Sequence, residues 1–124
     1  MLMSLICYKT TITFSAFNTV NNQAMTTLHI INKPAGHPAC RNAQIAVSDG
    51  DTLLFIEDGV NALFSGSTGA AEFEVLFRHC TVYCLEADAR ARGLFARLPE
   101  WVQRADYDLF VTLTTQHKRT LSWF

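Results

Sequence analysis

The chain has 124 residues, of which 49% are hydrophobic and 17% are charged, and its formal net charge is −1. This length fits one domain, and the scattered lysines and arginines exclude a basic stripe of the kind that binds nucleic acid directly. The apolar content exceeds that of an average soluble domain. We therefore expect part of the surface to contact another subunit.

Residues 1–25 differ in composition from the rest of the chain. Lys9 is the one charged residue before Met25, and it follows the first apolar run instead of preceding it, so the segment does not fit a secretory signal. No run of about 18 apolar residues occurs, which excludes a membrane span. We predict a domain over residues 26–124 and a natural start at Met25, with a genuine N-terminal tail as the alternative.

Short β-rich runs alternate with helical stretches after Met25, which is the pattern of βαβ units that build a parallel sheet. The predicted strands are Leu28 to Ile31, Thr52 to Ile56, Thr81 to Leu85, Trp101 to Ala105 and Thr120 to Phe124. The fourth strand has a helical alternative that would begin at Pro99. The sequence therefore predicts an α/β domain with a mostly parallel sheet of about five strands.

The first predicted helix opens at Pro38, because proline suits a first turn in which its missing N–H would be unpaired anyway. Gly50 ends this helix. Apolar residues at helical spacing predict one buried stripe, made of Ala39, Ala43, Ala46 and Val47.

Three further helices are predicted, one after each of the second, third and fourth strands. One more segment, between the second and third strands, is ambiguous. Asp58 can cap a short helix after the second strand. Residues 67–79 fit either a helix or a strand, and we favour a short helix. Acids followed by bases from Glu86 to Gly93 complement a helix dipole. Asp106 or Asp108 can cap the last helix.

Polar residues follow the first two predicted strands. Asn32 and Lys33 come after the first strand, and Glu57, Asp58 and Gly59 come after the second. Ligands and partners of open α/β sheets gather beyond the carboxyl ends of the strands, so these five residues are candidates for partner contact at one rim. We favour a scaffold role, with a helix cap and a tight turn, over partner binding.

Four cysteines, at positions 7, 40, 80 and 84, have irregular spacing and form no CxxC pair, which favours reduced thiols in the cytoplasm. Cys40 is the candidate nucleophile, because the positive end of a helix dipole can lower the pKa of a thiol in the first turn. The alternative, which we favour, is that Cys40 is a small residue at the edge of the buried stripe.

No cofactor or metal is expected. The histidines His29, His37, His79 and His117 are dispersed without metal-ligand spacing, and the loop after the first strand lacks a glycine-rich phosphate motif. We predict that His29 is a structural histidine bonded near a sheet end. We expect His117 to complement the end of the last helix.

Four separated blocks, which together cover about 100 residues, resemble the TusB/DsrH family. The blocks are Leu28 to Lys33; Gly50 to Val60; Val82 to Leu85 with Asp88 and Ala91 to Leu94; and Asp106-Tyr107, Phe110-Val111, Leu113-Thr114 and Ser122-Trp123. None is specific alone, but their order and the tryptophan close to the C-terminus make the resemblance strong.

The resemblance implies a three-layer, DsrEFH-like domain that joins TusC-like and TusD-like subunits in a heterohexamer. In the Tus branch the complex carries persulfide sulfur toward 2-thiouridine formation at the tRNA wobble position, and the active cysteine lies on the TusD subunit. The resemblance thus implies a non-catalytic subunit that meets TusA-like and TusE-like sulfur carriers indirectly and binds neither nucleic acid nor membrane.

Three alternatives remain. The first is a DsrH-like subunit of a dissimilatory sulfur-oxidation complex, but such subunits usually carry a cysteine in the first helix. The matching position here is Ala43 or Gln44, and Cys40 lies about one turn earlier, so the resemblance favours the Tus branch. The second is a thiol sulfurtransferase that uses Cys40, and the third is a stand-alone homo-oligomeric small-molecule binder.

Overall fold

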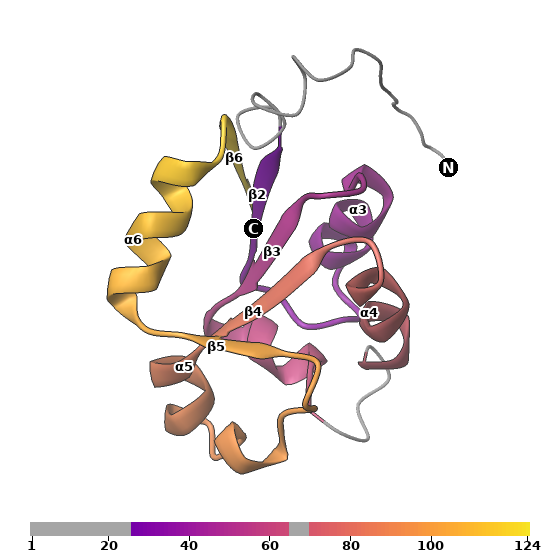
Figure 1. Ribbon diagram of the computed structural model, residues 1–124. Coiled ribbons are helices and arrows are strands. Elements are labelled where there is room, and N and C mark those ends of the chain that lie inside the picture. The colour runs from indigo at the N-terminus through magenta and orange to yellow at the C-terminus, as the bar shows by residue number, and fades with distance from the viewer. Residues whose placement is uncertain (1–25, 65–69) are drawn as a thin grey trace.

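A computed structural model describes residues 26–64 and 70–124. These residues form a five-stranded sheet in the order β5-β4-β3-β2-β6, and every neighbouring pair is parallel (Figure 1). The strands are β2 (Thr27–Ile31), β3 (Thr52–Phe55), β4 (Thr81–Leu85), β5 (Gln103–Ala105) and β6 (Arg119–Trp123). The predicted α/β class and parallel sheet are confirmed, while the prediction for residues 1–25 lies outside the described ranges.

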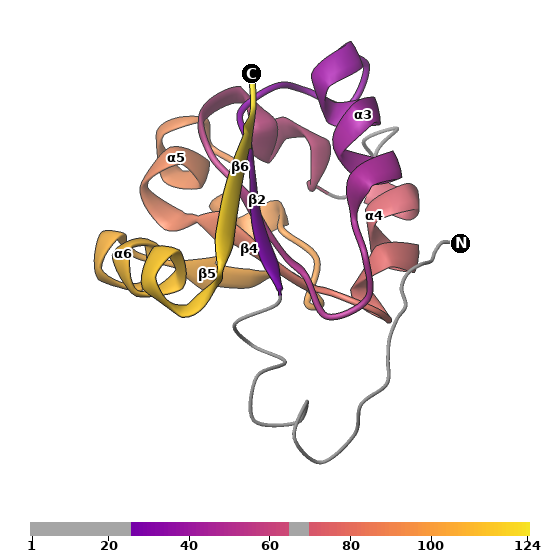
Figure 2. The same cartoon turned by 90° about the horizontal axis from the view of Figure 1, so that it is seen from above.

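Helices cover both faces of the sheet and give the fold three layers. The α-helices are α3 (Pro38–Ala46), α4 (Ala70–Phe77), α5 (Glu86–Ala91) and α6 (Tyr107–Gln116), and the short 3₁₀ helices are η1 (Glu57–Ala62) and η2 (Phe95–Arg97). Seen from above, α3 and α4 lie on one side of the sheet and α6 on the other (Figure 2). Within the described residues, no helix has the length and apolarity needed to cross a membrane.

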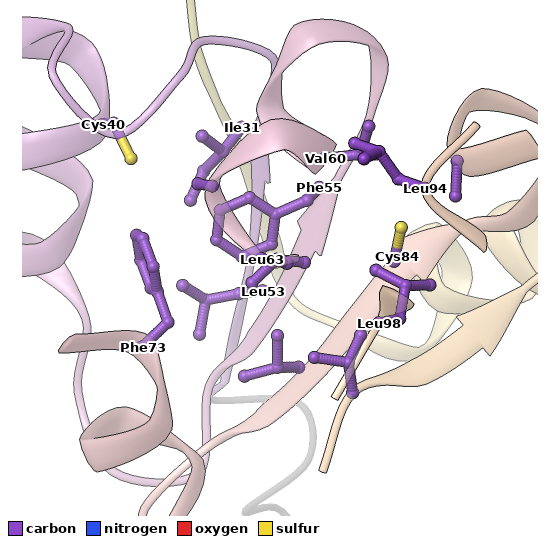
Figure 3. Close-up of a cluster of buried hydrophobic side chains, with 14 of the residues drawn as sticks. Ile31, Cys40, Leu53, Phe55, Val60, Leu63, Phe73, Cys84, Leu94 and Leu98 are labelled. Carbon is purple, nitrogen blue, oxygen red and sulfur yellow. The ribbon is translucent and has the colours of Figure 1, made fainter. Parts of the chain in front are cut away.

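The larger core lies between the sheet and the α3–α4 layer. All four residues of β3 are buried, as expected of a central strand covered on both faces. Phe55 from β3 meets Phe73 from α4 edge to face, with ring centroids 4.8 Å apart. Figure 3 shows Cys40 and Cys84 in this same cluster, each on a different side of the phenylalanine pair.

The smaller core lies under α6. Asp106 caps this helix as predicted, because its carboxylate accepts the N–H of Leu109 at 2.8 Å. Leu113 is buried against the sheet, with Leu109 and Phe110 packed around it. The strand β6 then returns to the far edge of the sheet beside β2, which confirms the predicted final edge strand.

The buried face of α3 differs from the predicted stripe. Ala39 and Ala43 are buried as expected, but Cys40 completes the set and Ala46 is exposed. The reason is that α3 ends at Ala46, and its last turn, including Ile45 at 80% exposure, is largely turned to solvent. The first two turns therefore supply the contact with the sheet.

Two further predictions need correction. Asp58 does not cap a helix: η1 begins after Ile56 without a side-chain cap, and Asp58 pairs with Arg92 instead. The helical alternative at Pro99 is wrong, because β5 forms there, although it is shorter than predicted. The short helix favoured within residues 67–79 is confirmed by α4.

Candidate partner-binding rim at the carboxyl ends of the strands

The strands β2, β3 and β4 are neighbours and parallel, so the segments that follow them meet at one edge of the sheet. Asn32 follows β2, and its amide nitrogen donates to a carboxylate oxygen of Glu57, at 3.0 Å, in the segment after β3. The structure therefore brings together the two polar groups that the sequence placed at a common rim. We call Asn32, Glu57, Asp58, Asp88 and Arg92 the carboxyl rim.

Gly59 allows η1 to approach the end of β2 closely. The N–H of Ile56 donates to the carbonyl of Ile31 at 2.9 Å, and a Cβ on Gly59 would lie 2.3 Å from that same carbonyl oxygen. No side chain fits at this distance, so glycine is required by the approach of two backbones. The sequence predicted a tight turn at Gly59, whereas the structure places Gly59 within η1 and requires glycine because of this close approach.

Asp88, in the segment that follows β4, binds the backbone of the rim. Its Oδ2 accepts the backbone N–H of Glu57 at 2.7 Å, where Glu57 adopts a left-handed conformation with φ of 49°. A non-glycine residue with positive φ is uncommon and needs support from its surroundings. We infer that the Asp88 carboxylate stabilises this conformation and so positions the side chain of Glu57.

Arg92 completes the rim from the end of α5. Its Nε and Nη2 donate to Oδ1 of Asp58 at 3.3 and 3.0 Å, and its Nη1 lies 3.9 Å from Oδ1 of Asp88. Sequence reasoning assigned the charges of this segment only to the helix dipole. The spacing of Asp88 and Arg92, four residues apart on one helix, was the available signal that they could pair.

The rim carries a net negative charge, because Glu57, Asp58 and Asp88 outnumber Arg92. The side chain of Asp58 is 64% exposed, so its charge is available to another molecule. Lys33 is half-buried and forms no ion pair with any residue in ranges 26–64 and 70–124. The geometry favours contact with a positively charged surface.

One acceptor in the rim is unsatisfied. The amide oxygen of Asn32 is buried and has no hydrogen-bond partner in the described part of the chain. Turning the amide over would place this oxygen against the carboxylate of Glu57, so the observed orientation is the favourable one. A buried acceptor without a donor costs free energy, which a donor from another subunit would recover.

Cys40 lies in the core and is not part of the rim. Only 1% of its surface is exposed, and Figure 3 shows its sulfur directed toward the interior. Burial, helped by the nearby Glu72 carboxylate and opposed by the smaller effect of Arg41, raises the pKa of the Cys40 thiol to about 11. The raised pKa goes against the nucleophile hypothesis, and the burial of Cys40 on α3 agrees with the favoured alternative of a small residue on the buried stripe.

Cys80 and Cys84 have the same character. Burial raises the pKa of each thiol to about 12, with nearby aspartates as a further cause. Thiolates are the reactive form of cysteine, so thiols with such pKa values are poor nucleophiles near neutral pH. Both behave as the small buried side chains that the sequence predicted.

His29 belongs to a buried network beside β2. Its Nε2 lies 2.9 Å from Oδ2 of Asp51, and the indole N–H of Trp123 donates to its Nδ1 at 3.1 Å. An indole N–H can only donate, so Nδ1 of His29 is the acceptor. Nε2 therefore carries the ring proton and donates a hydrogen bond to Asp51. Asp51 also accepts the backbone N–H groups of Thr27 and Ser48. His29 is thus the structural histidine that the sequence predicted.

His117 closes the last helix in the predicted way. Its Nδ1 lies 2.8 Å from the carbonyl of Leu113, and its Nε2 lies 2.9 Å from the hydroxyl of Thr52. No cluster of three or more metal-ligating side chains occurs in the portion of the chain that the structure describes.

Known proteins resemble this chain over most of its length. A family model described as "DsrH like protein" matches residues 34–120. Protein TusB of Pectobacterium parmentieri is 31% identical over 96 residues, which cover 77% of this chain and 99% of that protein. Protein TusB of Salmonella arizonae is 35% identical over 79 residues, which cover 62% and 79% of the two chains. The chain therefore belongs to the TusB/DsrH family.

Proposed function

We propose that this protein is a non-catalytic subunit of a TusBCD-like heterohexamer in the cytoplasm. In that complex it supports persulfide transfer for 2-thiouridine formation at the tRNA wobble position. TusC-like and TusD-like chains are its direct partners, and TusA-like and TusE-like sulfur carriers are linked through them. Sulfur passes through a cysteine on a partner chain.

The burial of Cys40 carries this proposal. A sulfur acceptor must present a thiolate to its donor, whereas Cys40 is enclosed by the core and its pKa is raised to about 11. Cys80 and Cys84 are buried in the same way. Membership of the TusB/DsrH family supports a place in the sulfur relay, and relatives named TusB favour the thiolation branch over sulfur oxidation.

The carboxyl rim is the surface that we assign to partner binding. It is exposed, negatively charged and held in one arrangement by Asp88 and Gly59. A preorganised surface loses little conformational entropy when it binds, and its charge selects a basic partner surface. The rim contact is therefore expected to contribute specificity as well as affinity.

A sulfur-loading experiment tests the non-catalytic role. The isolated chain is incubated with a persulfide donor and its cysteine-containing peptides are analysed by mass spectrometry. We expect no peptide with Cys40 to gain the mass of a sulfur atom, whereas the TusD-like subunit of a reconstituted complex gains it. Stoichiometric loading of Cys40 would favour the alternative of a self-sufficient sulfurtransferase.

Charge reversal tests the partner-binding rim. Asp58→Lys should reduce co-purification with TusC-like and TusD-like chains, because it places a cation where a basic partner surface is expected. Glu100→Lys is the matched control: it makes the same charge change at an exposed residue that precedes β5, at the opposite end of the strands. Equal co-purification of both variants would show that the rim is not part of the interface.

A further inference from the structure

The outer edge of β6 is open in the described part of the structure. β6 lies at the end of the strand order and pairs only with β2 on its inner side. Figure 2 looks onto this edge, with β6 in front of β2. Four of its five residues, Arg119 to Ser122, are exposed. Unpaired N–H and C=O groups on an edge strand are a template for another strand.

β6 lacks the features that usually block edge pairing. It contains no proline, and its single charged residue, Arg119, stands at its start. Leu121, at its centre, is 38% exposed, and Phe124, just after it, is 65% exposed. Natural edges without prolines, central charges or bulges tend to be covered by something else.

The sequence of this strand is complementary to itself. When two copies are placed antiparallel about a twofold axis at Leu121, Leu121 faces Leu121, Thr120 faces Ser122, and Arg119 faces Trp123. One step further out, Lys118 faces Phe124. Each cation therefore meets an aromatic ring, the two hydroxyl residues meet, and no two like charges stand opposite each other.

The side-chain directions agree with this pairing. Trp123 packs on the α3 side of the sheet, so Leu121 and Arg119, which lie two and four residues earlier, face the same side. A twofold axis perpendicular to the sheet keeps this side common to both copies. The Arg119–Trp123 and leucine contacts therefore lie together on one face of a continuous sheet, and the Lys118–Phe124 contacts lie on the other face.

We propose that two copies of this protein associate through antiparallel pairing of their β6 strands. The partner is a second copy of this chain, and the twofold axis passes beside Leu121. The proposal requires no other subunit and so does not depend on the proposed function. Because the contact is one short strand, the affinity is expected to be weak, with dissociation in the range of about 1–100 µM.

The test uses opposite charges at the proposed axis. The full chain should show a monomer–dimer equilibrium by sedimentation equilibrium. Leu121→Lys and Leu121→Glu should each be monomeric, because each places two like charges face to face. An equimolar mixture of these two variants should recover the dimer, because lysine then faces glutamate.

Val111→Lys is the matched control. Val111 is 63% exposed on α6, so the same charge is introduced at a still more exposed apolar residue away from β6, and the dimer should persist. A full chain that stays monomeric up to about 100 µM overturns the proposal. A mixture that fails to recover dimer also overturns it, as does a Val111→Lys variant that dissociates as much as Leu121→Lys.

Cysteine cross-linking keeps the proposal testable if a charged variant does not fold. Leu121→Cys should form a disulfide between copies under mild oxidation, because directly opposed residues of antiparallel strands have Cα atoms about 4.5–5.5 Å apart. Ser122→Cys faces Thr120 and should not cross-link with itself. Equal cross-linking of the two variants, or none at position 121, contradicts the pairing.

Discussion

Two of the aspartates that accept backbone N–H groups lie at opposite ends of the sheet. Asp51, just before β3, accepts the N–H of Thr27 at 3.1 Å, and Asp88, after β4, accepts the N–H of Glu57 at 2.7 Å. The interaction is the same, but the side chain of Asp51 is 8% exposed and that of Asp88 is 21% exposed. Because the hydrogen bonds are alike, we infer that the difference in burial decides whether each carboxylate mainly stabilises the fold or shapes a surface.

The buried aspartate serves the fold and the exposed one serves a surface. Asp51 also binds His29 and the N–H of Ser48, so its removal would leave several buried donors without an acceptor. Asp88 orders Glu57 next to charges that still face solvent. We therefore expect substitutions around Asp51 to change stability, and substitutions in the carboxyl rim to change partner binding more than stability.

The largest expected effect is that of Asp51→Ala. It leaves two backbone N–H groups and the Nε2–H of His29 unpaired in the interior, so the free energy of unfolding should fall by about 3 kcal/mol or more. Urea denaturation measures this change. The control is Asp49→Ala, because Asp49 is 88% exposed and its loss should be nearly neutral. Similar stabilities for the two variants would contradict the role of Asp51.

Gly59→Ala is expected to come next. The new Cβ would lie 2.3 Å from the carbonyl oxygen of Ile31, so backbone must move, at a cost of about 2 kcal/mol. Gly36→Ala is the matched control, because a Cβ at Gly36 meets nothing within 4 Å. Thermal unfolding of both variants would show whether the close approach of η1 to β2 is essential. A neutral Gly59→Ala would mean that η1 can shift freely.

Trp123→Phe should have a smaller effect on the Asp51 network. It keeps an aromatic ring beside His29 but removes the indole N–H that donates to Nδ1, so the unfolding free energy should fall by about 1 kcal/mol. Phe124→Leu, at a residue that is 65% exposed, should leave stability unchanged. An unchanged melting temperature for Trp123→Phe would show that the indole bond contributes nothing.

The smallest expected effect on stability is that of Asp58→Ala. The ion pair with Arg92 is exposed, and such pairs contribute less than about 1 kcal/mol. Partner binding should nevertheless weaken, because a charge of the rim is lost. A binding titration with the partner subunits, run beside urea denaturation, separates these effects. A large loss of stability with unchanged binding would contradict the partner-binding role assigned to the carboxyl rim.

Local patterns predicted most of the fold. The strand Thr81–Leu85 has the predicted bounds, and α4 forms where a helix was favoured over a strand. The Asp106 cap of α6 could be predicted because the capping residue, the first turn and the apolar stripe are close together in the sequence. Such features depend on residues within about one or two helical turns, which is the range that periodicity and capping rules cover.

The errors have a different origin, since they depend on contacts between distant segments. Asp58 was expected to cap a helix, but Arg92, 34 residues later, binds it instead. The pKa of Cys40 depends on how deeply the core encloses the thiol, which the helix position alone does not reveal. The two aspartate networks likewise join segments more than 20 residues apart, so the sequence predicted a structural role for His29 but neither network.

The most direct test of the central claim is sulfur transfer by a reconstituted complex that contains Cys40→Ser. Serine is close in size to cysteine and leaves the core largely intact, while it removes the only thiol proposed as an alternative sulfur carrier. With the TusC-like and TusD-like subunits present, we predict transfer at the rate of the unsubstituted complex. Loss of transfer from a complex that still assembles would contradict a non-catalytic role and assign the sulfur to Cys40.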